Sequence, residues 1–105
     1  MQIQELNNLT KLFDCYGRLL TPKQYEVMDK LLNLDIGESE MAELANGSRQ
    51  SIYDAIKKAK KQLLEFEKKC GFVEHNEKIR LSLLNFKTKL SDAQAKELEK
   101  IITKI

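Results

Sequence analysis

The sequence predicts an all-α protein that folds as a single domain. Leucine outnumbers valine 16 to 2, and the 105 residues include one proline and four glycines, so helix-favouring residues dominate and strand-favouring residues are scarce. Apolar residues recur at steps of three and four along most of the chain, which is the spacing of amphipathic helices. With 42% hydrophobic and 32% charged residues, the chain is too hydrophobic to be disordered.

An apolar stripe within the first 20 residues predicts the first helix, and its members are Leu6, Leu9, Phe13, Tyr16 and Leu20. A second helix is expected at 22–34. Thr21, Pro22 and Gln24 supply in succession an N-cap, a first-turn proline and the partner residue of a capping box. The turn-forming segment 35–37 ends this helix. Its inward side is expected to consist of Tyr25, Met28 and Leu32.

A short third helix is predicted at about 38–45, with an apolar side made of Met41, Leu44 and Ala45. Asn46 and Gly47 end it, and the hydroxyl of Ser48 is placed to cap the next helix. That fourth helix, at 48–69, carries the most regular seam of the sequence: Ile52, Ile56, Ala59, Leu63, Phe66 and Cys70. At 1.5 Å per residue it would be about 33 Å long, so we expect an unbroken rod.

Gly71 is expected to stop the long helix, and two further helices follow it. Ile79, Leu83, Phe86 and Leu90 mark the fifth, and Leu98, Ile102 and Ile105 mark the sixth. Ser91 and Gln94 repeat the capping-box pattern between them. We therefore expect one domain over 1–105, with a core at 1–69 and a helical hairpin at 70–105. The long helix and the hairpin present more amphipathic surface than a small bundle covers, which predicts a homodimer.

Several classes of protein are excluded by what the sequence lacks. No apolar run exceeds two residues, so we expect no membrane span and no signal peptide, and a cytoplasmic protein. Cys15 and Cys70 lack metal-ligand spacing and are accompanied by one histidine, so we predict buried thiols, no metal and no cofactor. There is no glycine-rich phosphate loop, serine elbow or histidine pair, which argues against an enzyme.

Residues 38–58 have the spacing of a helix-turn-helix, in which a short helix braces a second helix whose first turns project polar side chains into a groove. The candidate nucleic-acid-binding residues are Ser48, Arg49, Gln50 and Tyr53 in those first turns, followed by Lys57, Lys58, Lys60 and Lys61. Arginine and glutamine can make two hydrogen bonds to a base edge, and lysines can contact phosphates. The alternative for the lysines is a helix face that contacts only solvent. The alternative for the residues of the first turns is packing within the chain.

The brace and the long helix carry opposite charges. Segment 35–45 has four acidic residues and no basic one, net −4, whereas 48–69 has seven basic and three acidic residues, net +4. Carboxylates beside a groove-reading helix would oppose a phosphate backbone. The charge pattern therefore favours a polyanion contact in the middle of the long helix over reading of a DNA groove.

The motif Leu20-Thr21-Pro22-Lys23-Gln24, followed by the helix-turn-helix of residues 38–58, resembles region 3/4 of bacterial sigma factors. The resemblance to a second family is closer. Residues 12–17, 19–24 and 48–57 look like the corresponding motifs of the YlxM family, over about residues 6–69. Glu38, Ala45 and Gly47 depart from that family's pattern, so we expect a looser helix-turn-helix. The resemblance implies a helix-turn-helix fold and a regulatory role in the signal recognition particle pathway.

These observations leave three hypotheses. The first is a non-enzymatic regulatory or adaptor protein of the signal recognition particle pathway, whose partners would be the particle's RNA and GTPase. The second is a sequence-specific DNA-binding transcriptional regulator resembling sigma region 4, and the third is a structural partner that self-associates through its long helix and hairpin. No membrane partner is expected under any of them.

Overall fold

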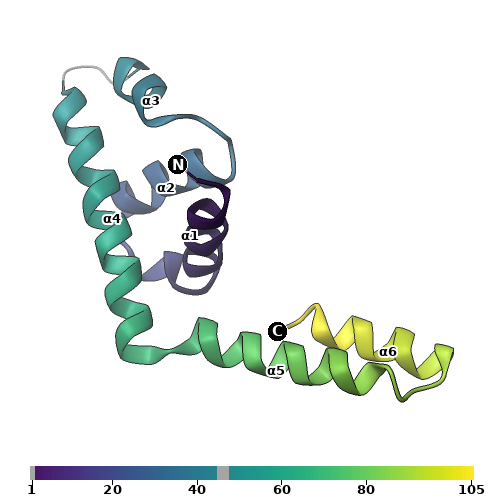
Figure 1. The fold of residues 1–105 in the computed structure, drawn as a ribbon. Coiled ribbons are helices and arrows are strands. Elements are labelled where there is room, and N and C mark those ends of the chain that lie inside the picture. Colours follow the sequence, from purple (N-terminus) through teal and green to yellow (C-terminus); the bar gives the residue numbers. More distant parts are fainter. Residues whose placement is uncertain (1, 45–47) are drawn as a thin grey trace. The chain divides into compact units, whose positions relative to one another are not determined.

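The computed structural model describes residues 2–44 and 48–105, all of whose regular elements are helical (Figure 1). The chain divides into two compact units, residues 1–70 and 71–105. The second unit begins at Gly71, where the sequence predicts a helix stop. Ala45, Asn46 and Gly47, on which the expected apolar side and end of the third helix partly depend, lie outside the described residues. The all-α fold class is confirmed.

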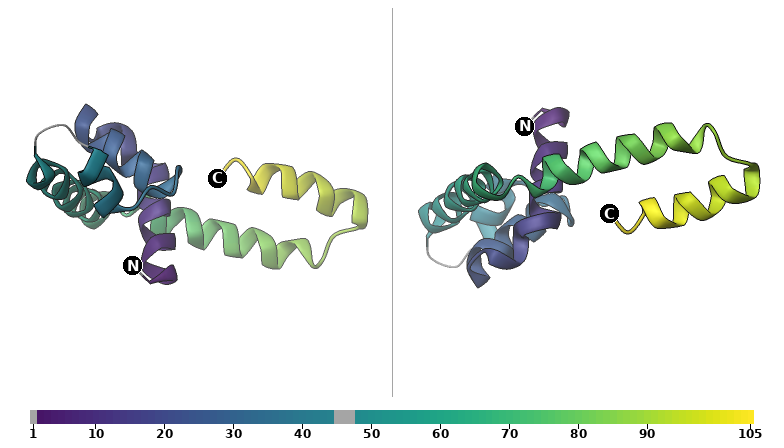
Figure 2. Two further views of the ribbon diagram at one scale, coloured as in Figure 1. Left: turned by 90° about the horizontal axis from the view of Figure 1, so that it is seen from above. Right: turned by 90° about the horizontal axis from the view of Figure 1, so that it is seen from below.

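The described residues of the N-terminal unit, 2–44 and 48–70, form four α-helices and one short 3-10 turn. They are α1 (Ile3–Tyr16), the turn Gly17–Leu19, α2 (Pro22–Leu32), α3 (Glu38–Leu44) and α4 (Arg49–Cys70). Helices α1, α2 and α3 all pack against α4, which runs along one edge of the unit (Figures 1 and 2). The expected long rod is therefore confirmed, since α4 runs unbroken for 22 residues.

Local signals set the ends of these helices. Thr21 and Gln24 form the complete capping box at the start of α2, with Pro22 in its first turn. The backbone N–H of Ser51 donates to the hydroxyl of Ser48 over 3.1 Å, so Ser48 caps α4 as its sequence position predicts. Gly71 follows the last residue of α4 with φ of +66°, a left-handed conformation that glycine adopts without steric cost.

The core of the N-terminal unit lies between α4 and the other helices, and its largest fully buried side chains are Tyr16, Met28, Ile56 and Leu63. The predicted inward side of α2 is correct at Met28 and wrong at Tyr25. Met28 is buried together with Val27 and Leu31, whereas Tyr25 is 41% exposed and its ring is tilted by 39° against that of Phe13, with ring centroids 5.0 Å apart. The turn of α2 about its axis is set by its neighbours, which sequence periodicity does not specify.

Two further predictions about burial are wrong. Leu44, expected on the apolar side of α3, is 71% exposed, and Ala42 is buried with Met41 instead. Cys15 and Cys70, expected in the core, are both exposed free thiols. Cys15 is exposed because α1 turns the next residue, Tyr16, into the core. Cys70 is exposed at the last position of α4.

The C-terminal unit is a hairpin of α5 (Phe72–Lys87) and α6 (Asp92–Ile102), which lie antiparallel and side by side (Figure 2). Ser91 and Gln94 form the predicted capping box at the start of α6. An ion pair between Lys87 and Glu99 joins α5 to α6, and Arg80 Nη2 of α5 donates a hydrogen bond of 3.1 Å to the carbonyl oxygen of Ile105, which follows α6. Within residues 2–44 and 48–105, no helix is both long and apolar enough to cross a membrane.

Candidate nucleic-acid interface

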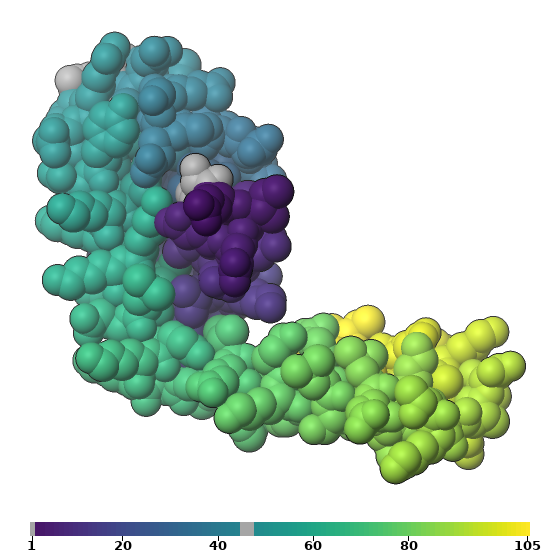
Figure 3. Space-filling model, viewed as in Figure 1, coloured from purple at the N-terminus to yellow at the C-terminus, as the bar shows by residue number. Residues whose placement is uncertain are grey.

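Seven of the eight candidate residues lie between Arg49 and Lys61 of α4, Ser48 directly precedes the helix, and the structure spreads them around the helix axis. Ser48, Arg49 and Gln50 are exposed at its start, and Tyr53 is 39% exposed one turn later. The space-filling view shows the outward side of α4 uncovered along this edge of the N-terminal unit (Figure 3). The side chains at the start of the helix are thus open to a ligand.

The four lysines point in three directions and do not form one cluster. Successive residues are rotated by about 100° around a helix, so Lys57 and Lys61, four apart, share the outward side. Lys58 faces α2, where it lines a hollow, and Lys60 faces α3, where its Nζ lies 3.8 Å from Glu38 Oε1. The single lysine face expected from the sequence is therefore divided, with Lys60 assigned to the brace.

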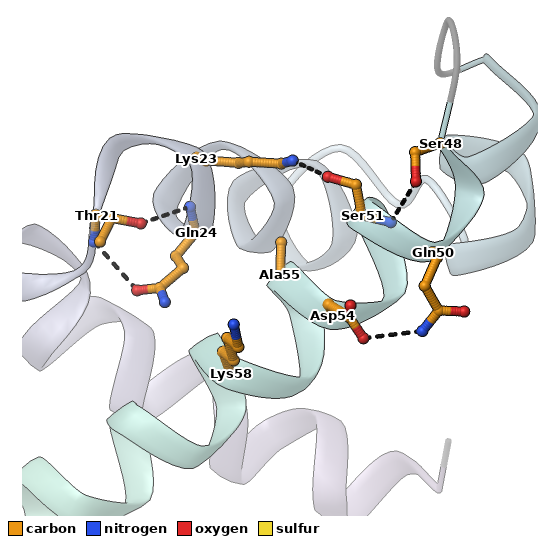
Figure 4. A pocket seen from close by; sticks show the side chains of 9 residues that line it. All are labelled: Thr21, Lys23, Gln24, Ser48, Gln50, Ser51, Asp54, Ala55 and Lys58. Atoms are coloured by element: carbon orange, nitrogen blue, oxygen red, sulfur yellow. Dashed lines mark hydrogen bonds between the residues drawn. The ribbon is translucent and has the colours of Figure 1, made fainter.

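A polar hollow of about 410 Å³ lies between the first turns of α2 and α4 (Figure 4). Its lining is made of Thr21, Lys23, Gln24, Ser48, Gln50, Ser51, Asp54, Ala55 and Lys58. Lys23 reaches across from α2 and donates a hydrogen bond from Nζ to the hydroxyl of Ser51 on α4. The hollow thus combines two ammonium groups, from Lys23 and Lys58, with hydroxyl and amide groups that can bind an anion.

Helix geometry adds to the positive character of this hollow. Both α2 and α4 begin beside it, and the exposed N–H groups of a helix start carry partial positive charge. One group opposes that character: the carboxylate of Asp54, which accepts a hydrogen bond of 2.9 Å from Gln50 Nε2. The amide of Gln50 is therefore already engaged, and reading a base edge would require it to leave Asp54.

Four lysines of α2 and α4 remain available to a ligand, and we name them the basic surface: Lys23, Lys57, Lys58 and Lys61. Among the residues that the structure describes, no ion pair involves these four or Arg49. Lys23 was not among the candidates from the sequence. Its neighbour Ser51 is 28 residues away in the chain, and no local pattern links the two positions.

The acidic brace lies on the other side of α4. Glu38 pairs with Lys60, and Glu40 and Glu43 are exposed on α3. Arg49, Tyr53 and Lys60 lie toward this side of α4, since they follow one another at steps of four and seven. A polyanion on α4 would therefore meet attraction at the basic surface and repulsion near α3.

The fold and this surface define a small helix-turn-helix protein, a class in which a braced helix contacts nucleic acid. The comparison with protein families makes the assignment specific. The chain belongs to the UPF0122 family, described as "Putative helix-turn-helix protein, YlxM / p13 like", whose model matches residues 3–105. The predicted resemblance to the YlxM family is thereby confirmed.

Relatives of the same family name come from several bacteria. A UPF0122 protein of Clostridium kluyveri is 37% identical over 103 residues, covering 94% of this chain and 93% of the relative. One of a Thermoanaerobacter species is 36% identical over 97 residues, covering 92% and 83%. One of Acetivibrio thermocellus is 47% identical over 62 residues, covering 59% and 53%. No solved structure matches the chain.

Proposed function

We propose that this chain is a non-enzymatic regulatory protein that binds RNA through the basic surface, Lys23, Lys57, Lys58 and Lys61. The observation that carries the proposal is the hollow between α2 and α4, where Lys23 and Lys58 converge from two helices. Lys57 and Lys61 extend the positive charge along the outward side of α4. Phosphate groups would dock on these ammonium groups, and the hydroxyl and amide groups that line the hollow would contact the sugars and bases beside them.

The acidic brace favours RNA over a DNA duplex. A duplex groove that received the first turns of α4 would bring phosphates close to Glu40 and Glu43 on α3. A single strand or a loop can instead follow the basic surface on the side of α2, away from these carboxylates. The hydrogen bond between Gln50 and Asp54 adds to this preference, because it occupies the amide best suited to an adenine edge.

The family resemblance supplies the pathway in this proposal. It points to co-translational protein targeting, with the signal recognition particle's RNA and its GTPase as partners. The working form we propose is a homodimer. The likeness of the helix-turn-helix to sigma region 3/4 is part of the same proposal.

A titration of the full chain with signal recognition particle RNA at several salt concentrations tests the proposal. Four phosphate contacts give a slope of log affinity against log salt of about −2.8 on single strands and about −3.6 on duplex. A double variant, Lys23→Glu with Lys58→Glu, should abolish most of this dependence. An affinity that neither salt nor this variant changes would refute RNA binding at this surface.

A sequence-specific DNA regulator is the second candidate, and the exposed Arg49 and Tyr53 at the start of α4 favour it. Such a regulator should prefer one duplex over random competitor by at least about 10³-fold. Selection from a pool of random duplexes, followed by the same titration with Arg49→Ala, distinguishes the two candidates. Enrichment of one sequence that depends on Arg49 would replace the RNA proposal.

A further inference from the structure

The C-terminal hairpin, residues 71–105, has almost no core of its own. Ile102 is its one buried residue, and α5 has none, although every residue of this range is described. Units shorter than about 40 residues usually require a disulfide, a metal or association with another chain. Both cysteines are free thiols outside the hairpin, so association is the remaining way to bury its apolar side chains.

Four of the six exposed large apolar side chains of the hairpin share one face, and the other two, Leu81 and Leu84, lie outside it. On α5, Ile79 and Phe86 are seven residues apart and so share one side of the helix, and they are 37% and 52% exposed. Phe72, seven residues before Ile79, lies on the same side. Phe86 directly precedes Lys87, which pairs with Glu99 of α6, and Ile79 directly precedes Arg80, which donates to Ile105 just beyond α6, so both are rotated by about 100° from these contacts.

On α6 the same relationship holds for Ile101, which is 55% exposed and directly precedes the buried Ile102. In two antiparallel right-handed helices, the residues that precede the contact positions lie on the same face of the pair. One apolar face, which we name the hairpin face, is therefore formed by Phe72, Ile79, Phe86 and Ile101. Leu81, which follows Arg80, lies on the opposite face and is 59% exposed.

The dimensions of the hairpin allow a contact at the small end of specific interfaces. The 16 residues of α5 extend about 24 Å, and two helices side by side are about 20 Å wide. Pairing of two such surfaces is comparable to the smaller stable protein interfaces, which bury less than the roughly 800 Å² per partner of a standard one. The hairpin carries seven basic and five acidic residues, net +2, so no strong field selects a highly charged partner instead.

We propose that the hairpin face pairs with the same face of a second copy of this chain, so that two hairpins form a four-helix bundle. A twofold axis makes such a contact self-complementary, since each copy offers the same apolar side chains to the other. Four helices around a shared core are a stable arrangement, whereas two are not. The inference specifies the surface of the homodimer proposed above and does not depend on nucleic-acid binding.

Sedimentation equilibrium of the full chain over about 1 to 500 µM tests the pairing. The wild type should approach twice the monomer mass of 12.2 kDa. Ile79→Glu with Phe86→Glu should raise the dissociation constant at least about 100-fold, because it places carboxylates in the shared core. Leu81→Glu, a matched change on the opposite face, should leave the constant within about 2-fold.

Amide hydrogen exchange of the wild type provides a readout that needs no variant. Protection of α5 and α6 should rise with protein concentration, while protection of the N-terminal unit should stay constant. A monomer at every concentration, a dimer that survives the double substitution, or equal disruption by Leu81→Glu would each overturn the proposal. RNA binding by a monomeric wild type would refute both the pairing and the proposed homodimer and would leave the proposed RNA binding standing.

Discussion

Glu38 and Lys60 form an ion pair of 3.8 Å that joins the start of α3 to the middle of α4. Lys60 is 27% exposed, whereas Lys57 and Lys61, three residues before and one residue after it, are exposed. The acidic brace thus removes one lysine of the sequence cluster from the available surface. The remaining cations face outward or toward α2, and this division makes the candidate interface testable one lysine at a time.

Lys57→Ala should weaken RNA binding and reduce the magnitude of the salt slope by about 1, because one phosphate contact is lost. Lys60→Ala removes the same charge from the same helix but from a side that Glu38 already neutralises. We expect its affinity to stay within about 2-fold of the wild type. Titrations of both variants at two salt concentrations make the comparison, and equal losses would contradict the assignment of Lys60 to the brace.

Asp54→Asn should raise the affinity for RNA. The substitution removes the negative charge that lines the hollow with Lys23 and Lys58, and it weakens the hydrogen bond from Gln50 because the acceptor is no longer charged. The loss of one like charge near bound phosphates corresponds to an increase of about 3- to 5-fold at low salt. Glu65→Gln, which makes the same change at an exposed position of α4 about three turns away, is the control. A decrease with Asp54→Asn would argue that no phosphate enters the hollow.

Tyr16→Phe should lower the free energy of unfolding by about 1.5 kcal/mol. The hydroxyl of Tyr16, from α1, donates to Glu67 Oε1 on α4 over 2.5 Å, and its ring lies 6.0 Å from that of Phe66. The variant keeps the buried ring and removes only the donor to a carboxylate. Urea unfolding measures the change, and Tyr25→Phe, at a residue that is 41% exposed, should cost less than about 0.5 kcal/mol. Equal effects of the two variants would show that this hydrogen bond contributes little.

The hairpin should lose stability in acid. The hydrogen bond and charge of Lys87 lower the pKa of Glu99 below its usual value of 4.5. A carboxyl group whose pKa is lower in the folded state adds stability above its unfolded pKa, and that contribution disappears as the pH falls through the folded value. The protection factors of the amides in α5 and α6, which compare the measured exchange with the intrinsic exchange at each pH, should therefore fall below about pH 4 in the wild type. Glu99→Gln should show a smaller fall, and an identical pH profile in both proteins would exclude a role for this pair.

Most of the secondary structure follows from local sequence. The capping boxes at Thr21 and Ser91, the cap at Ser48 and the stop at Gly71 all lie where their residues predict them. These signals act within one turn of helix, so four or five residues contain all the information they need. The unbroken length of α4 is likewise predicted by its own seam of apolar residues.

Only part of the candidate site could be predicted from the sequence. Periodicity shows that Lys57 and Lys58 point in different directions, but it does not show which helix covers which direction. The pairing of Lys60 with Glu38 and the approach of Lys23 to Ser51 join positions 22 and 28 residues apart, and no local pattern encodes them. The same reason explains the errors at Tyr25, Leu44 and the two cysteines, whose exposure depends on neighbouring helices.

The amino-acid sequence by itself determined that this chain is helical, where its helices begin and end, which charges it carries and which family it resembles. These properties follow from interactions between residues close together in the chain. Only the tertiary structure decided which lysines converge on a hollow, which are neutralised by the brace, and which apolar face of the hairpin is left exposed. Those features arise where separate helices pack, and the orientation of each helix about its axis is fixed there by burial of the common core.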